Sequence, residues 1–376
     1  MNAPFKEKIR DTFEYFHTHP EISWEEKKTT TYIQNTLEKS GCRVQTFEDC
    51  TGVIGDYGNF SGKVPIIGIR ADIDALWQKV DGELQANHSC GHDAHMTMVL
   101  GVLWKMKEDE QLKEKIGVRF IFQPAEEVGA GALKMVEKGV VDEIDYLYGI
   151  HLRPIQETAN GFAAPSILHG ATGSLEFEIQ GDDAHGARPH LTHNAIEIGN
   201  HILNALNTIH LNPSIAHSLK VTKFQSGGKN LNIIPGSASI GLDLRSQTNE
   251  LMKELQQRVK EILHTTSELY GVPIEVTKDY GIAAAELSEK AQTYAHRAIV
   301  NVLGEKNVTP PLVTPGGDDF HFYTIRKPHL KATMVGLGCD LQPGLHHPNM
   351  KFEKDSLFNG IEILTEIVKL HSRKDG

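Results

Sequence analysis

The chain of 376 residues contains little of what marks secreted, membrane and nucleic-acid-binding proteins. Its four cysteines form no Cys-x-x-Cys pair and show no disulfide framework, so a reducing cytoplasm is the expected location. No apolar run reaches the ~20 residues that a membrane helix needs, and the first residues show no secretory signal. The net charge is −11 and no basic block occurs, so we expect neither nucleic acid nor a membrane as a partner.

The composition is that of a folded protein. Hydrophobic residues make up 39% and charged residues 23%, which leaves enough apolar material for a core. Domains usually hold roughly 100–200 residues, so the length favours two of them.

The first half of the chain alternates between strand and helix patterns. Apolar runs at 64–74, 118–123 and 145–151 predict buried strands, the last of them ending at His151. Segments with helical periodicity predict helices at 6–21, 25–41, 97–109 and 132–139. This alternation is typical of an α/β protein, with a mixed, mainly parallel sheet covered by helices.

A different order begins near residue 172. A strand, a helix, two strands, a long helix and a final strand follow one another, which is the pattern of a ferredoxin-like βαββαβ module. Helices and one more apolar strand then return. We therefore expect one domain, formed by 1–171 and 282–376, to be interrupted by a second domain at 172–281.

The stretch HSCGHDAHMTM gathers possible metal ligands. Cys90 and His92 flank Gly91 ahead of a helix expected to begin near Met96, and a thiolate and an imidazole at this spacing can reach one ion. A helix-capping turn, with Asp93 as the cap and Cys90 as a small buried hydrophobe, is the favoured interpretation of this stretch in isolation.

Acids and histidines also follow several predicted strands at their carboxyl ends, where open α/β sheets bind ligands. These residues are Asp72, Asp74, Glu126, Glu127, His151, His346 and His347. A solvated loop explains any one of them, but it explains four such loops in one chain poorly. Mixed nitrogen, oxygen and sulfur donors favour one or two divalent ions such as Zn²⁺, Mn²⁺, Co²⁺ or Ni²⁺.

The adjacent pair Glu126 and Glu127 indicates a possible reaction. One carboxylate can bind a metal ion while its neighbour serves as a general base for a water molecule that the ion activates. On its own, such a pair more often marks the charged start of a helix.

Eight segments follow one another in the order of a known family. They are IRADIDAL, CGHDAH, FQPAEE, GIHLRP, AHGARPH, NLNIIPGSASIGLDLR, PGGDDF and LHHP. With them, nearly the whole chain resembles the amidohydrolase/aminoacylase branch of the M20 metallopeptidase family. The resemblance implies a di-metal catalytic domain that is interrupted by a ferredoxin-like lid. Because that lid commonly dimerises in the family, we expect a homodimer.

The resemblance also implies roles for residues of the catalytic domain. The implied metal ligands are Cys90, His92, Glu127, His151 and His346. Glu126 matches the general base of the family. Asp72 matches an acid that orients a metal ligand.

Three residues of the predicted lid match residues of the family that act on the substrate, one of them catalytic and two substrate-binding. His185 is similar to a histidine that polarises the scissile carbonyl, often across a dimer interface. Asn232 and Arg245 match residues that hold the substrate carboxylate, for which the guanidinium fork is suited. Each has a plainer alternative, since His185 could belong to a capped turn, Arg245 to a cross-strand ion pair, and Asn232 to the turn before Pro235.

Two departures from the family lie close to the predicted metal ligands. Trp77 stands where the family usually has proline, and Asn87, His88 and Ser89 precede CGHD where Met-His-Ala is usual. Both changes bear on the range of substrates more than on the chemistry.

The predicted function is metal-dependent hydrolysis of the amide bond in N-acyl amino acids or small peptide-like amides. A dipeptidase or aminopeptidase with the same metals is the nearest alternative. A catalytically silent, metal-stabilised dimerisation module is another, although it would not need a free base. A Cys90 nucleophile with a histidine base is a third alternative.

Overall fold

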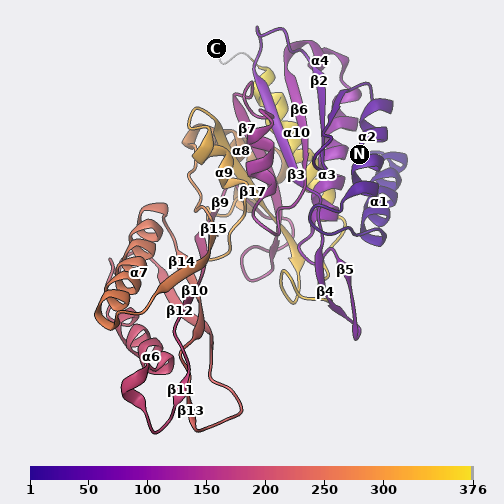
Figure 1. The fold of residues 1–376 in the computed structure, drawn as a ribbon. Helices are drawn as coiled ribbons and strands as arrows, with labels where there is room; N and C mark the ends of the chain where they lie inside the picture. Colours follow the sequence, from indigo (N-terminus) through magenta and orange to yellow (C-terminus); the bar gives the residue numbers. More distant parts are fainter. Residues whose placement is uncertain (374–376) are drawn as a thin grey trace. The chain divides into compact units, whose positions relative to one another are not determined.

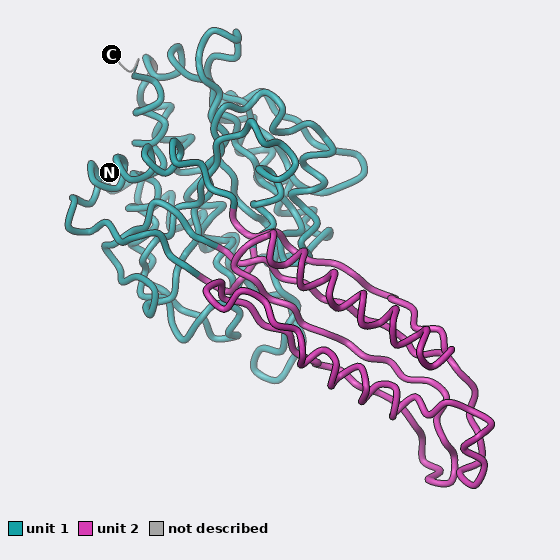
Figure 2. The backbone as a smooth tube through the Cα atoms, turned by 90° about the vertical axis from the view of Figure 1, so that its left-hand side faces the viewer, with its two compact units in different colours: residues 1–168, 286–313, 318–376 teal, residues 169–285, 314–317 magenta. Residues whose placement is uncertain are grey.

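In the computed structural model, which describes residues 1–373, the chain forms two compact units (Figure 2). The first unit comprises Met1–Leu168, Glu286–Val313 and the chain from Asp318. The second comprises His169–Ala285 and Thr314–Gly317. The roles of catalytic domain for 1–171 and 282–376 and of lid for 172–281 stay predictions.

The first unit is built on a seven-stranded sheet with the order β1-β2-β6-β3-β7-β17-β8 (Figure 1). The four strands β6, β3, β7 and β17 are mutually parallel, whereas β1, β2 and β8 join antiparallel. Their bounds are β1 (Arg43–Thr46), β2 (Val53–Gly58), β3 (Ile66–Asp72), β6 (Gly117–Gln123), β7 (Tyr146–Pro154), β8 (Ala163–Ala164) and β17 (Lys331–Leu341). The predicted α/β class with a mixed, mainly parallel sheet is confirmed.

Helices cover both faces of this sheet because its strands are apolar on both faces. Val118, Phe120 and Phe122 of β6 join the core that contains residues of α1, α3, α8 and α10, whereas Ile121 joins the core of α5 and α9. Successive side chains of a strand point to opposite faces, which explains this division. The helices are α1 (Ala3–Thr18), α2 (Lys27–Lys39), α3 (His92–Lys107), α4 (Glu110–Lys115), α5 (Gly131–Glu137), α8 (Glu289–Leu303), α9 (His321–Arg326) and α10 (Ser356–Ser372).

Two predicted boundaries in the first unit are wrong. Helix α3 begins at His92, four residues before Met96, because Gly91 adopts a left-handed φ of 87° and turns the chain directly into the helix. Gly91, and not Asp93, occupies the cap position. Strand β7 does not end at His151 but continues to Pro154, because β17 pairs with it as far as that residue.

The second unit has a four-stranded antiparallel sheet with the order β12-β14-β10-β15. Leu175, Phe177 and Ile179 of β10 pack with α6 and α7 on one face, and the residues between them are more exposed. The elements are β10 (Ala171–Ile179), α6 (Ala195–Leu206), β12 (His217–Ser226), β14 (Ala238–Ser246), α7 (Asn249–Tyr270) and β15 (Ile274–Ile282). The predicted βαββαβ order is therefore confirmed.

Several short elements complete the fold. They are β4 (Leu76–Val80), β5 (Glu83–Asn87), β9 (Ile167–His169), β11 (Ala184–His185), β13 (Ile233–Ile234), β16 (Leu312–Thr314) and the 3-10 turns η1 (Pro189–Leu191) and η2 (Glu305–Asn307). Strands β4 and β5 form a separate hairpin directly before Cys90. Among residues 1–373, no helix is both long enough and apolar enough to cross a membrane.

Candidate active site

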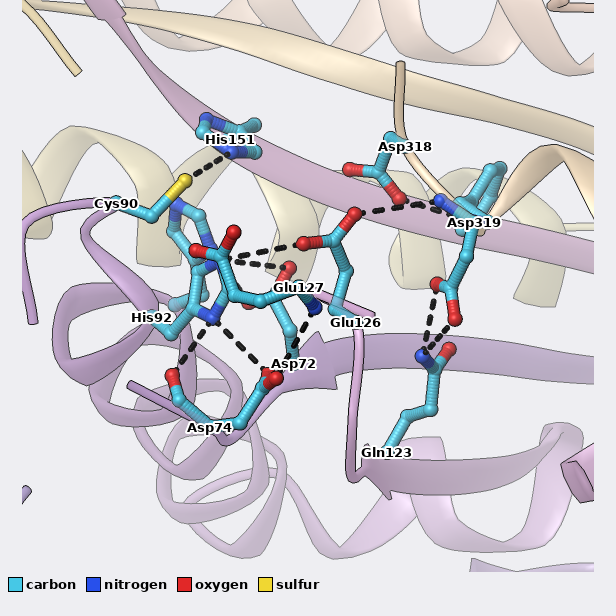
Figure 3. Close-up of polar contacts among 12 residues, drawn as sticks. Asp72, Asp74, Cys90, His92, Gln123, Glu126, Glu127, His151, Asp318 and Asp319 are labelled. Carbon is cyan, nitrogen blue, oxygen red and sulfur yellow. Dashed lines mark hydrogen bonds and ion pairs between the residues drawn. The ribbon is translucent and has the colours of Figure 1, made fainter. Parts of the chain in front are cut away.

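Six of the predicted site residues lie together at the carboxyl end of the parallel strands of the first unit, and all of them except His346 are labelled in Figure 3. They are Cys90, His92, Glu126, Glu127, His151 and His346. The ligand atoms of Cys90, His92 and His151 lie within 4.8 Å of one another, and so do those of Cys90, Glu127 and His346. The two groups share Cys90, and together they would offer sulfur, nitrogen and oxygen donors to one or two divalent ions.

The thiol of Cys90 is the centre of this group. His346 Nε2 lies 3.3 Å from its sulfur, and His151 Nε2 lies 3.7 Å from it. Glu127 is close to both neighbours, with Oε2 3.5 Å from His346 Nε2 and Oε1 3.8 Å from His92 Nε2. Sulfur, imidazole nitrogen and carboxylate oxygen therefore face a common space.

Backbone carbonyls orient two of the histidines. His92 Nδ1 lies 2.8 Å from the carbonyl oxygen of Asp74, and His151 Nδ1 lies 2.7 Å from that of Leu152. A nitrogen facing a carbonyl must carry the proton, so Nε2 keeps its lone pair and points toward the thiol group. Within residues 1–373, buried His92 Nε2 and Glu127 Oε1 make no hydrogen bond. Two unpaired ligand atoms at this place fit a bound cation.

The pKa shifts of Cys90 and Glu127 also fit a bound cation. Burial raises the pKa of the Cys90 thiol well above its usual range, and Glu127 raises it further. Burial also raises the pKa of Glu127 to about 7. A cation held between these two side chains would favour the thiolate and the carboxylate, which are the forms that bind metals.

Glu126 lies beside the metal-ligand candidates but has different contacts. Its Oε2 is 3.9 Å from His92 Nε2, and its Oε1 accepts a hydrogen bond from the backbone N–H of Asp319 at 3.3 Å. Burial, together with the carboxylates of Asp318 and Glu127, raises the pKa of Glu126 well above its usual range. A carboxyl group whose pKa is raised accepts a proton more readily than an exposed glutamate does, which suits a general base.

Two residues at the site have a left-handed backbone conformation: Ala125, which precedes Glu126, and His346. Ala125 has a φ of 53° and His346 a φ of 63°, although neither is a glycine. The N–H of Ala125 donates to the buried carboxylate of Glu26, and the N–H of His346 donates to the carbonyl of Ser89. Uncommon backbone conformations that the surroundings hold in place are frequent at functional sites.

Asp72 contacts His95, Arg70 and His92, and its role as an orienting acid stays a prediction. Its Oδ1 is 2.7 Å from His95 Nδ1, and its Oδ2 accepts from Arg70 at 2.6 Å and lies 3.6 Å from His92 Nε2. His95 Nε2 in turn accepts the N–H of Leu152 at 3.1 Å, beside His151. His95 thus supports the site without facing the thiol.

Several residues of this site were absent from the predicted set. Arg70, Gln123, Asp318 and Asp319 form a buried polar network next to Glu126. Figure 3 shows Gln123, Asp318 and Asp319 beside it. The motif PGGDDF contains two of them, and the acids in it are the signal that could have indicated the network. Arg70 and Gln123 lie in otherwise apolar strands. A charged or amide side chain in such a strand is rarely buried without polar partners, and this was the signal that the sequence offered for them.

The predicted catalytic residue His185 and the predicted substrate-binding residues Asn232 and Arg245 belong to the second unit. His185 on β11 is exposed, and the N–H of the next residue donates to the carbonyl of Asn232 at 2.7 Å. Arg245 on β14 is part-buried and donates to Asp243 from Nε at 3.1 Å and Nη2 at 2.9 Å. The cross-strand register places Arg245 opposite Thr172 and Ser218.

Known proteins resemble the chain along nearly its whole length. N-acetyl-L-cysteine deacetylase from Bacillus subtilis (strain 168) is 30% identical over 370 residues, which is 94% of this chain and 86% of that protein. IAA-amino acid hydrolase ILR1-like 4 from Arabidopsis thaliana is 29% identical over 327 residues, which is 82% of this chain and 72% of that protein.

A solved structure has the same fold. It is the Bacillus subtilis YXEP protein, described as a dinuclear metal binding peptidase from the M20 family, with a TM-score of 0.81 and 24% identity. The match covers 98% of this chain and 99% of that one. The model of peptidase family M20/M25/M40 matches residues 68–370. The chain therefore belongs to this family and is a metallo-enzyme of its amidohydrolase branch.

Proposed function

We propose that this enzyme hydrolyses the amide bond of an N-acyl amino acid or a small peptide-like amide, using one or two bound divalent ions. The observation that carries the proposal is a free carboxylate beside a set of metal-ligand candidates. Glu126 approaches His92 to 3.9 Å, while Glu127 faces both His92 and His346. The names of the deacetylase and the hydrolase above also indicate amino acid derivatives as substrates.

The residues that would hold the ions are Cys90, His92, Glu127, His151 and His346. Their sulfur, nitrogen and oxygen donors suit Zn²⁺, Mn²⁺, Co²⁺ or Ni²⁺. When bound, such ions supply positive charge that lowers the pKa of water and polarises a carbonyl oxygen.

Glu126 would serve as the general base. In this role its carboxylate takes the proton of the attacking water and then gives the proton to the leaving nitrogen. Burial of the carboxyl group favours the protonated form, so the proton can be held between these two transfers. Burial also keeps bulk water from competing for the proton.

Three residues of the second unit would act on the substrate. His185 would donate to the carbonyl oxygen as negative charge develops there. Asn232 and Arg245 would bind the carboxylate of the amino acid and align the amide bond. A homodimer formed through this unit and a cytoplasmic location are parts of the same proposal.

The test is a substrate panel with and without a chelator. We expect hydrolysis of N-acetyl amino acids, loss of the activity on chelation, and recovery on addition of one of the four ions. Hydrolysis of free dipeptides alone would favour the dipeptidase or aminopeptidase. If the metal-loaded protein cleaves nothing, the silent dimerisation module is the better explanation. Inactivation by thiol alkylation, without any effect of chelation, would favour Cys90 as nucleophile.

A further inference from the structure

The orientation of the Glu126 carboxylate depends on a small number of contacts. In the part of the chain that the structure describes, the one hydrogen bond that reaches this carboxylate comes from the backbone N–H of Asp319, at 3.3 Å. A glutamate side chain has several staggered rotamers available to it. The position of one N–H group therefore selects among them.

Asp319 is itself held by four hydrogen bonds to its side chain. Its Oδ1 accepts from Arg70 Nη2 at 2.9 Å and from Gln123 Nε2 at 2.8 Å. Its Oδ2 accepts from Gln123 Nε2 at 3.0 Å and from the backbone N–H of Ala132 at 2.8 Å. The side chain is fully buried, so water does not compete for these bonds.

Gln123 links the Asp319 side chain to strand β6, which ends shortly before Glu126 (Figure 3). Its Oε1 accepts from Arg70 Nε at 3.0 Å and from the Tyr323 hydroxyl at 3.0 Å, while its amide nitrogen is used by Asp319. Gln123 ends β6, three residues before Glu126. The end of β6 therefore fixes the backbone of Glu126. Through the side-chain amide of Gln123 it also fixes the Asp319 N–H that orients the Glu126 carboxylate.

We propose that Asp319 is a positioning residue for Glu126: its buried side chain fixes the place of its own backbone N–H, and that N–H aims the Glu126 carboxylate. This inference rests on the proposed function, in which Glu126 is the general base. A small displacement of a catalytic group is costly, because proton transfer requires hydrogen-bond distance between the base and the attacking water.

Asp319→Asn is the variant that isolates this role. It keeps the backbone N–H and the size of the side chain, but replaces one acceptor oxygen with an NH₂ group. Either orientation of the new amide turns a donor toward donors, namely Arg70 and Gln123 on one side or Gln123 and Ala132 on the other. The side chain must therefore shift, and its N–H shifts with it.

The test is a double-mutant cycle with Glu126→Gln, measured as kcat and KM on an N-acetyl amino acid with metal content determined for each protein. We expect Asp319→Asn to lower kcat about 10–100-fold, as for supporting partners of catalytic ligands, with little change in KM or metal content. In the Glu126→Gln background, Asp319→Asn should lower kcat no further, because there is no longer a base to aim.

Asp56→Asn is the matched control. Asp56 is a buried aspartate of the same unit that accepts from Arg119 Nε at 2.7 Å and Nη2 at 2.9 Å, but it has no contact with Glu126. It should leave kcat near the original value. If Asp319→Asn proves unstable, Tyr323→Phe removes only the hydroxyl that donates to Gln123 and should give a smaller loss with the same non-additivity.

The outcomes distinguish a failure of the positioning role of Asp319 from a failure of Glu126 as the general base. Wild-type kcat in Asp319→Asn, or the same further loss in the Glu126→Gln background, would overturn the positioning role and leave Glu126 as the base. An equal loss of kcat in Asp56→Asn would also overturn it, because general destabilisation would then explain the effect. Near-normal kcat in Glu126→Gln would remove Glu126 as the base, and the inference with it.

Discussion

Two buried arginines of the same sheet stand in very different electrostatic surroundings. Arg119 on β6 donates to Asp56 from Nε at 2.7 Å and from Nη2 at 2.9 Å, and Arg43 donates to the same carboxylate at 2.7 Å. Glu143 approaches Arg119 to 3.4 Å. These two cations and two carboxylates balance one another within the protein.

Arg70 on β3 meets an excess of negative charge. Its guanidinium donates to Asp72 at 2.6 Å and to Asp319 at 2.9 Å, and it lies 3.4 Å from Asp318. Glu126 also acts on it electrostatically. Buried carboxylates in excess are costly unless a proton or another cation offsets them. The charges of the Asp56 cluster balance one another, whereas the excess carboxylates of the Arg70 cluster need a proton or a neighbouring cation to offset them.

The largest expected difference between the clusters comes from removing one charge from each. Glu126→Gln should lower kcat by about 10²–10⁴-fold, the usual contribution of a general base, while metal content and thermal stability are kept. Asp56→Asn should keep kcat but lower Tm, because Arg119 and Arg43 lose the charge that they share. Steady-state kinetics and thermal unfolding of both variants make the comparison. If Asp56→Asn loses activity as strongly as Glu126→Gln, the distinction between the clusters is wrong.

Loss of the Cys90 thiol should weaken metal binding, whereas loss of a buried thiol outside the candidate site should not. Cys90→Ala should reduce the metal content found by elemental analysis and abolish the rise in Tm that added metal produces. Cys339→Ala is the matched control, since Cys339 is also a buried free thiol but contacts the carbonyl of Arg153. It should keep both the metal content and the metal-dependent rise in Tm. Unchanged metal stoichiometry in Cys90→Ala would remove the thiol from the ligand set.

A smaller effect on stability should appear at Glu26, which supports the backbone of Ala125. Burial raises the pKa of Glu26 to about 7. Because this pKa is above that of the unfolded chain, the folded state holds the proton longer, and its stability falls as the pH rises through both values. Glu26→Gln cannot ionise, so its Tm should fall less than that of the original protein between about pH 5 and 8. Parallel curves of Tm against pH for the two proteins would contradict the raised pKa.

The smallest predicted effect concerns the second unit. Arg245→Ala should raise KM for N-acetyl amino acids more than for their carboxamides, because only the former offer a carboxylate to the guanidinium. Arg258→Ala is the control, since Arg258 is an exposed arginine that pairs with Glu261 in the same unit. Equal changes of KM for both substrate types would leave Arg245 as the partner of Asp243 and nothing more.

Much of the fold follows from local patterns in the sequence. Periodicity is enough for the strands of the first sheet and for the βαββαβ order of 172–281, because each element has one consistently apolar side. The predicted start of α3 was too late because His92 and His95 make the first turn of the helix polar. The left-handed conformation of Gly91 cannot be recognised from a pattern of apolar residues. The end of β7 depends on pairing with β17, which is far away in sequence.

The candidate site was predictable where a rule links sequence to space. Strand ends of an open α/β sheet meet at one edge, and this is why Glu126, Glu127, His151 and His346 could be grouped in advance. No spacing rule links Glu26 to Ala125 or Asp319 to Gln123, which are 99 and 196 positions apart. Such contacts between distant segments require the folded structure.

Titration of the chelated protein with metal tests the central claim most directly. Chelated protein, shown to be metal-free by elemental analysis, is titrated with Zn²⁺, Mn²⁺, Co²⁺ or Ni²⁺ while hydrolysis of an N-acetyl amino acid is followed. We predict that activity is absent at the start and returns in step with bound metal until one or two ions are held per chain. Full activity of the metal-free protein would contradict the account.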